Sequence, residues 1–176
     1  KSIRTTSIKP SGTVSLLNGS TPGIHFPEDE YYIRRIRFSE DSKVLDKLRT
    51  AGYTIEKDKY SPRTMVVEFP VHEPHFTKSK RDVSMWEQLE IAAQYQHYWA
   101  DNSVSVTVTF KEAEAHQIKD ALEMYETRLK AVSFLKYEET GYVQAPYESI
   151  TKETYEKMSA VITPLRRMDD HDGGSG

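Results

Sequence analysis

The chain has 176 residues, of which 37% are apolar, 11% are aromatic and none is cysteine. Its 24 Lys and Arg residues against 27 Asp and Glu residues give a net charge of −3, which is not the basic balance of a nucleic-acid-binding domain. The missing cysteines exclude disulfides, thiolate metal sites and cysteine nucleophiles carried by this chain. No apolar run reaches the roughly 18 residues of a membrane span, and the first residues lack a signal-peptide stretch. We therefore expect a globular, cytoplasmic protein with no direct nucleic-acid or membrane binding.

The first half of the chain alternates strand-like and helix-like stretches, a pattern typical of α/β proteins. Apolar spacing predicts, in chain order, a strand, a short helix, a second strand and a longer helix: 31–38, 42–51, 63–71 and 84–100. Gly52 ends the short helix, and Ser84 with Glu87 forms a capping box that begins the longer one. The large aromatic residues of this longer helix are expected in the core rather than in a cofactor site: Trp86, Tyr95, Tyr98 and Trp99.

Residues 103–110 predict a strand with two different faces. Its valines and Phe110 lie on one face, and its Ser and Thr side chains lie on the other. Both faces of a strand in an open parallel sheet are usually apolar. The hydroxyl-lined face therefore favours a barrel whose interior borders a site, with an open sheet as the alternative.

The remaining elements extend the same order. Apolar spacing predicts a helix over 115–129, a strand over 131–137 and a last helix that Thr151 caps and Pro164 ends. The order of strands and helices predicts parallel strands joined by right-handed crossovers, with the helices outside. We assign residues 1–165 to one domain and expect the polar, glycine-rich residues 166–176 to form a flexible tail.

The strongest candidate site is the loop at 9–17, where a strand passes through a Pro and Gly turn into a helix. Exposed main-chain amides at a helix start, neighbouring hydroxyls and a glycine that permits close approach are what a phosphate group requires. The residues concerned are Pro10, Ser11, Gly12, Thr13 and Val14, followed by Ser15. The loop lacks the full pattern of a P-loop, so an ordinary capped loop is an equal alternative.

Three other features are weaker candidates. His25 lies in a loop rich in Gly and Pro and could orient or protonate a ligand, but a packing role in the loop is favoured. His72 and His75 have a ligand-like spacing, but the intervening proline and the lack of a third ligand disfavour zinc. The arginines at 34–37 are expected to form a solvated face that pairs with the acidic run 28–30.

Six segments, in order, closely resemble the later part of the catalytic subunit of class II ribonucleotide reductases, in particular the monomeric, adenosylcobalamin-dependent triphosphate reductases. They are 5–14, 22–26, 32–38, 67–70, 98–105 and 152–156. The resemblance runs from about residue 1 to about residue 165. It implies that 1–165 is the C-terminal portion of a ten-stranded α/β barrel with alternating strands and outer helices.

The resemblance also implies roles for individual positions. In that family the loop matching 10–14 holds the substrate's phosphates through main-chain amides and hydroxyls. The strand matching 132–135 borders the site, and in oxygen-dependent reductases it carries a radical-relaying tyrosine pair. Phe134 and Leu135 stand there in this chain, which fits a radical generated in place from adenosylcobalamin. Ser15 and His25 are further possible site-lining residues, and no metal ligand is expected.

The family's catalytic cysteines have no counterpart in this chain. The resemblance places the radical and reducing thiols outside the matched stretch, so no catalytic residue is expected here. We expect a piece of a reductase whose partners are the preceding portion with the cysteines, a ribonucleotide substrate and a thioredoxin-type reductant. Alone, the chain is expected to be inactive and to aggregate or partly unfold. The alternatives are a non-catalytic nucleotide- or phosphate-binding module with the same fold and a purely structural element.

Overall fold

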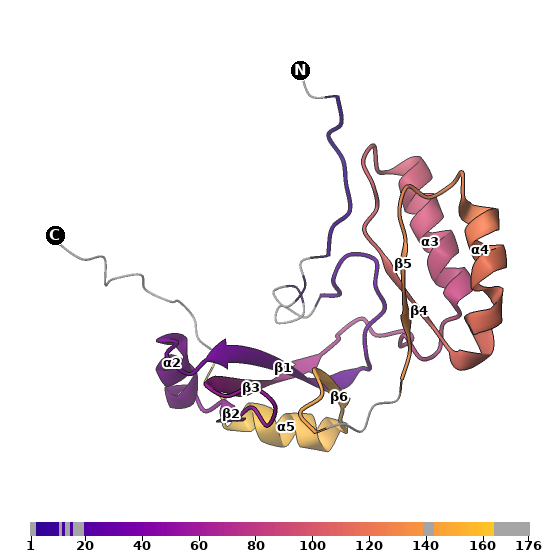
Figure 1. The fold of residues 1–176 in the computed structure, drawn as a ribbon. Helices are drawn as coiled ribbons and strands as arrows, with labels where there is room; N and C mark the ends of the chain where they lie inside the picture. Colours follow the sequence, from indigo (N-terminus) through magenta and orange to yellow (C-terminus); the bar gives the residue numbers. More distant parts are fainter. Residues whose placement is uncertain (1–2, 11, 13–14, 16–19, 139–142, 164–176) are drawn as a thin grey trace.

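The fold is that of a computed structural model, which describes residues 3–10, 12, 15, 20–138 and 143–163 (Figure 1). Predictions for Ser11, Thr13, Val14, Pro164 and the tail 166–176 fall outside the described residues. The elements are, in chain order, β1 Tyr31–Ser39, α2 Val44–Thr50, β2 Thr54–Lys57, β3 Thr64–His72, α3 Met85–Tyr98, β4 Thr107–Phe110, the 3₁₀ helix η1 Glu112–Gln117, α4 Ile118–Tyr125, β5 Ser133–Lys136, β6 Tyr147–Ser149 and α5 Lys152–Ala160. The mixed α/β class is confirmed.

The strands form two sheets rather than one parallel series. β4 and β5 pair in parallel as predicted, but β1, β2, β3 and β6 form an antiparallel sheet in the order β2-β3-β1-β6. The prediction of parallel strands throughout was therefore wrong. It missed β2, which is joined to β3 by only six residues, 58–63, and a parallel connection needs a dozen or more. Once β2 and β3 form a hairpin, β3 is free to pair with β1 in the opposite direction.

The antiparallel sheet carries one helix on each face, because successive side chains of a strand point to opposite sides. On one face, Val67 and Phe69 of β3 pack against α2 through Leu45 and Leu48. On the other face, α5 lies along the sheet (Figure 1). There Tyr155 packs against the stacked rings of Tyr31 and His72, whose centroids are 4.6 Å apart.

The parallel pair β4 and β5 is covered by α3 and α4, which lie side by side in Figure 1. Met85, Leu89 and Val108 are fully buried between these layers. The predicted start of α3 is confirmed, since the Ser84 hydroxyl accepts a hydrogen bond from the Glu87 N–H at 3.1 Å. No helix in the described residues is long and apolar enough to cross a membrane.

The aromatic residues of α3 do not all enter the core as predicted. Trp86 packs against the buried cluster between α3 and α4. Tyr95, Tyr98 and Trp99 are instead exposed, Tyr98 to 82%. Tyr95 and Tyr98 lie on the last turn of α3, and Trp99 directly follows this helix.

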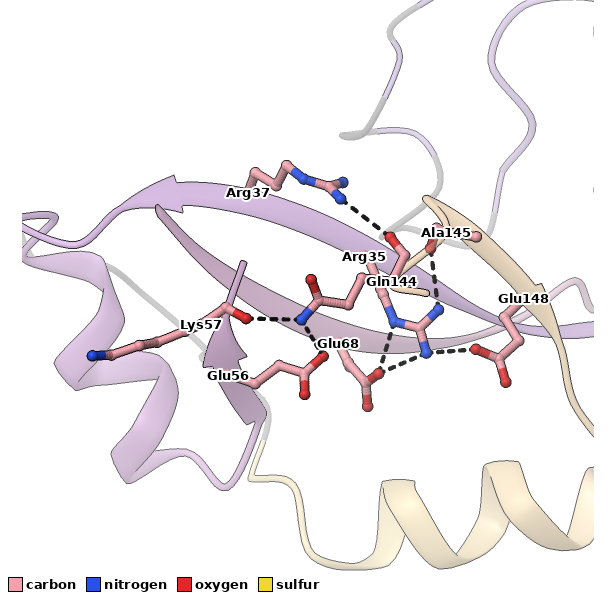
Figure 2. Close-up of polar contacts among 8 residues, drawn as sticks. All are labelled: Arg35, Arg37, Glu56, Lys57, Glu68, Gln144, Ala145 and Glu148. Carbon is pink, nitrogen blue, oxygen red and sulfur yellow. Dashed lines mark hydrogen bonds and ion pairs between the residues drawn. The ribbon is translucent and has the colours of Figure 1, made fainter. Parts of the chain in front are cut away.

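Three arginines of β1 hold the segment that precedes β6. Arg34, Arg35 and Arg37 donate side-chain hydrogen bonds to the main-chain oxygens of residues 146, 145 and 144, at 3.1–3.2 Å. Figure 2 shows the Arg35 guanidinium lying between the Ala145 carbonyl and the carboxylates of Glu68 and Glu148. The expected pairing of these arginines with the acidic run 28–30 was therefore wrong for Arg35 and Arg37.

A bidentate ion pair joins α3 to the end of α4. The Glu90 carboxylate accepts hydrogen bonds from both terminal nitrogens of Arg128, at 2.7 and 2.8 Å, and from the Tyr125 hydroxyl at 3.1 Å. The Arg128 guanidinium, with Tyr125 and Gln94, lowers the pKa of Glu90 from 4.5 to about 2. The pair therefore stabilises the native packing above pH 4.5 and loses this effect as the pH falls toward 2.

We predict that Glu90→Gln accelerates hydrogen exchange in peptides covering 118–130 at neutral pH, because the charged acceptor is lost. The ratio of variant to wild-type rates should approach one as the pH falls from about 4.5 to about 2, because wild-type Glu90 then becomes protonated. Mass spectrometry at matched pH values measures this ratio, in which intrinsic exchange rates cancel. Glu123→Gln on the outer surface of α4 is the control. A ratio independent of pH would contradict the prediction.

Candidate phosphate-binding site

The free edge of β4 organises the candidate site. β5 pairs with one edge of β4, and three different groups satisfy the backbone on the other edge. The Ser105 N–H donates to the Ile8 carbonyl at 2.9 Å, the Thr107 N–H to His25 Nε2 at 3.0 Å, and the Thr109 N–H to Gln88 Oε1 at 2.9 Å. These three hydrogen bonds hold the N-terminal segment, the His25 loop and α3 beside β4, the strand that carries the threonine hydroxyls.

The contacts of His25 determine its tautomer. Its Nε2 accepts from the Thr107 N–H, and its Nδ1 lies 2.6 Å from the Pro22 carbonyl, which can only accept. Nδ1 is therefore the nitrogen that donates, and Nε2 is the one that accepts. Both ring nitrogens are used for structure, which supports the packing role rather than proton transfer.

Asp101 holds the N-terminal segment beside β4. Its Oδ2 accepts hydrogen bonds from the Thr5 N–H and hydroxyl at 3.3 and 3.2 Å, and its own N–H donates to the Thr6 hydroxyl at 2.9 Å. The Thr5 N–H, with the hydroxyls of Thr5 and Thr6, lowers the pKa of Asp101. A parallel bridge between Ile8 and Val104 continues the pairing. The chain is thereby directed along β4 toward Pro10.

Gly12 has the geometry that close approach of a ligand requires. Its φ of +62° is in the left-handed region, and a Cβ added there would meet no atom within 4 Å. The carbonyl of Gly12 accepts a hydrogen bond from the Ser15 hydroxyl at 3.1 Å. At Gly23, also left-handed, an added Cβ would lie 3.5 Å from the backbone of Pro10. The turn is thus supported from one side and open on the other.

A cavity of about 250 Å³ lies beside this turn. The N-terminal turn, the His25 loop, β4, β5 and β6 all contribute to its wall. The lining residues are Pro10, Gly12, Pro22, His25, Phe26, Pro27, Glu28, Lys80, Gln88, Thr107, Thr109, Leu135 and Tyr147. Burial raises the pKa of the Tyr147 phenol, so this side chain is neutral at ordinary pH.

The structure brings together four of the predicted site residues and separates others. Pro10, Gly12, His25 and Leu135 line the cavity. Phe134 points the opposite way, because strand neighbours alternate, and packs with Phe110 against the helices. The hydroxyl face of β4 lines the cavity through Thr107 and Thr109, as expected for a barrel interior.

The structure also bears on the predictions for His72 and for a metal site. His72 stacks on Tyr31. Within the described part of the chain, no group of three His, Cys, Asp or Glu side chains is arranged to hold a metal.

Sequence reasoning missed Glu28, Lys80, Gln88 and Tyr147 as lining residues. Lys80 lies in a short run of charged residues, and Tyr147 follows the turn before β6. No local spacing distinguishes either from a surface residue. Only the pairing of β6 with β1, which places Tyr147 opposite Arg34, brings Tyr147 to the cavity.

The model of the ribonucleotide reductase barrel domain matches residues 3–135. The chain belongs to this family. An adenosylcobalamin-dependent ribonucleoside-triphosphate reductase of Euglena gracilis is 49% identical over 89% of the chain, and one of Levilactobacillus brevis is 43% identical over 92%. A crystal structure of a B12-dependent class II ribonucleotide reductase superposes with a TM-score of 0.77 and 42% identity over 90% of the chain. The sequence-based resemblance is confirmed.

The chain spans only 22% of the length of these two relatives and 23% of the crystallised chain. The two-sheet arrangement is therefore a portion of the reductase barrel. The relatives' activity belongs to chains more than four times as long.

We predict that Asp101→Ala releases the N-terminal segment and increases tryptic cleavage after Arg4, because the acceptor for the Thr5 N–H and hydroxyl is lost. Asp101→Asn should have a smaller effect, since an amide oxygen still accepts one bond. Limited proteolysis with mass detection of the cleaved fragments measures this. Asp120→Ala, on the exposed surface of α4, is the matched control. Equal cleavage in Asp101→Ala and wild type would refute the anchoring role.

Proposed function

We propose that this chain forms the substrate-phosphate-binding wall of a ribonucleotide reductase, which replaces the 2′-hydroxyl group of a ribonucleotide with hydrogen. The observation that carries the proposal is the left-handed, open Gly12 at the rim of a cavity shared by the N-terminal turn and two barrel strands. Family membership and the triphosphate-reductase names of the relatives support it. A ribonucleoside triphosphate is the proposed substrate class.

The residues assigned to the substrate are those of the turn at 10–14. Pro10, Ser11, Gly12, Thr13 and Val14 would hold the phosphates through main-chain N–H groups and hydroxyls, apart from Pro10, which has no N–H. The open side of Gly12 allows a phosphate oxygen to approach the backbone without a side-chain clash. The hydrogen bonds that the β4 backbone donates to His25 and Gln88 hold this wall of the cavity in place.

The thiol chemistry is assigned to the remainder of the reductase. The chain has no cysteine, and thiyl-radical formation and reduction of the substrate each require thiols. A thioredoxin-type reductant would act on that remainder. This chain therefore binds and orients substrate but contains no catalytic residue.

Adenosylcobalamin is the proposed cofactor of the complete enzyme, following the names of the relatives. The cavity of about 250 Å³ lies below the roughly 300–1,000 Å³ typical of sites for drug-sized ligands. It fits a phosphate group and not a corrin ring with its adenosyl group. This cavity is therefore assigned to the phosphate group and not to the corrin ring.

We predict unequal effects on the KM for two similar substitutions of Gly12 in the full-length reductase. Asn and Asp both tolerate the left-handed region better than other residues and have nearly equal size. If a phosphate lies there, Gly12→Asp should raise the KM for substrate by at least roughly tenfold more than Gly12→Asn, because it adds a negative charge beside a polyanion. Steady-state kinetics with matched thermal-unfolding curves measure this, and equal KM values for the two variants would overturn the proposed function.

We also predict that this chain alone has no reductase activity and that activity returns when the cysteine-bearing remainder is supplied as a second polypeptide. Deoxyribonucleotide formation with adenosylcobalamin and a dithiol is the measurement. Each polypeptide assayed separately is the control. Turnover by the isolated chain would contradict the assignment of the thiols.

A further inference from the structure

Lys80 lines the same cavity as Gly12 without belonging to the predicted phosphate loop. Among the cavity-lining residues that the structure describes, Lys80 carries the cationic side chain and Glu28 the anionic one. Both ring nitrogens of His25, the remaining base, are already engaged in hydrogen bonds to the protein. A polyanion that enters the cavity therefore meets one fixed positive charge, on a residue that precedes α3.

The backbone around Lys80 is rigid. Its N–H donates to the Pro27 carbonyl at 2.9 Å. The preceding residue, Ser79, is fully buried, and its N–H and hydroxyl both donate to Asp82 Oδ2, at 2.9 and 2.8 Å. The following residue, Arg81, forms an ion pair with Asp29. The base of the Lys80 side chain is thus held against the loop that carries Glu28.

The contacts that position the Lys80 ammonium group do not use all three of its N–H donors. It forms an ion pair with Glu28 and lies 5.1 Å from the ring centroid of Tyr147 and 5.7 Å from that of Tyr137. Ring faces attract a cation through their negative π density and need no N–H donor. A lysine has three donors, and Glu28 is the only hydrogen-bonding acceptor of this ammonium within the described residues. Donors therefore stay available for a ligand.

The pair is also sheltered from water. The side chains of Lys80 and Glu28 are 26% and 14% exposed. Charges in such a partly buried place are screened less by solvent and salt than surface charges. The Arg34 guanidinium on the same Tyr147 ring, at 4.4 Å from the centroid, adds a second cation behind the cavity wall. Lys80 and Arg34 thus place two cations beside the Tyr147 ring, against the one carboxylate of Glu28.

We propose that Lys80 is a further substrate-binding residue, which binds a phosphate group of the nucleotide held at 10–14 and shares its ammonium between that phosphate and Glu28. This inference rests on the proposed function. It extends the phosphate site to the segment between β3 and α3. Glu28 then lowers the affinity of Lys80 for the phosphate by competing for the same ammonium group. The rings of Tyr137 and Tyr147 hold this ammonium group toward the cavity.

The test uses inorganic tripolyphosphate as a competitor of the ribonucleoside triphosphate in the full-length reductase. Lys80→Gln should raise both the KM for substrate and the inhibition constant of tripolyphosphate by roughly 10-fold to 100-fold, the loss expected for one charge-assisted hydrogen bond. It should change kcat little. Lys80→Arg should restore most of the binding. Lys78→Gln, which removes a neighbouring lysine paired with Glu87, is the matched control and should behave as wild type.

The variant Glu28→Gln separates ligand binding from a purely structural ion pair. The proposal predicts that it lowers the inhibition constant of tripolyphosphate, because the ammonium is freed and a repelling carboxylate is lost. A structural pair predicts the same direction of change in Glu28→Gln and Lys80→Gln, together with a similar drop in melting temperature. That outcome would overturn the inference.

The two levels of proposal fail in different ways. If the Gly12 variants weaken substrate binding while Lys80→Gln leaves the KM and the inhibition constant unchanged, the role of Lys80 is wrong and the phosphate loop stands. If the Gly12→Asp and Gly12→Asn variants bind substrate equally well, the phosphate loop itself is wrong.

Discussion

The unpaired edge of β4 is the constraint on which the rest of the site depends. A strand edge inside a protein must have its N–H groups satisfied, since a buried donor without a partner costs about 1–3 kcal/mol. Here a main-chain carbonyl, an imidazole and a side-chain amide each accept one of these bonds, from Ile8, His25 and Gln88. The three acceptors come from separate parts of the chain. Satisfying one strand therefore assembles the N-terminal turn, the His25 loop and α3 around a single cavity.

A second set of contacts ties the antiparallel sheet to this cavity. Alternation along β1 sends Arg34 to the face that bears Tyr147, and sends Arg35 and Arg37 to the opposite face. All three still reach the carbonyls before β6, because that segment passes along the edge of the sheet. The Gln144 side chain completes the attachment: it donates to the Lys57 carbonyl (Figure 2) and accepts from the Lys59 N–H. The wall that Tyr147 provides is therefore held by the antiparallel sheet.

The ion pairs of the described residues fall into two groups, those on the surface and the one at the cavity. Most ion pairs of the described residues lie on the surface and contribute little individually. The pair of Lys80 and Glu28 is instead sheltered at the cavity, where it costs more to desolvate and acts more strongly on a ligand. The absence of cysteine from the sequence fits a wall that orients an anionic substrate while the thiols are carried elsewhere.

The sequence by itself determined most of the local elements and the family, and it selected the turn at 10–14 as the candidate phosphate site. Helix caps such as Ser84 and alternations such as that of residues 103–110 are encoded by spacings of two to four residues, which can be read directly. The tertiary structure alone decided that β1 and β3 run antiparallel and that Lys80 and Tyr147 reach the cavity. These outcomes depend on which distant strand pairs with a free strand edge. β2 directs this choice, but it is short and its local sequence pattern is too weak to be recognised. Strand pairing joins residues far apart in the chain, so its result is set by closure of the whole fold rather than by any one segment.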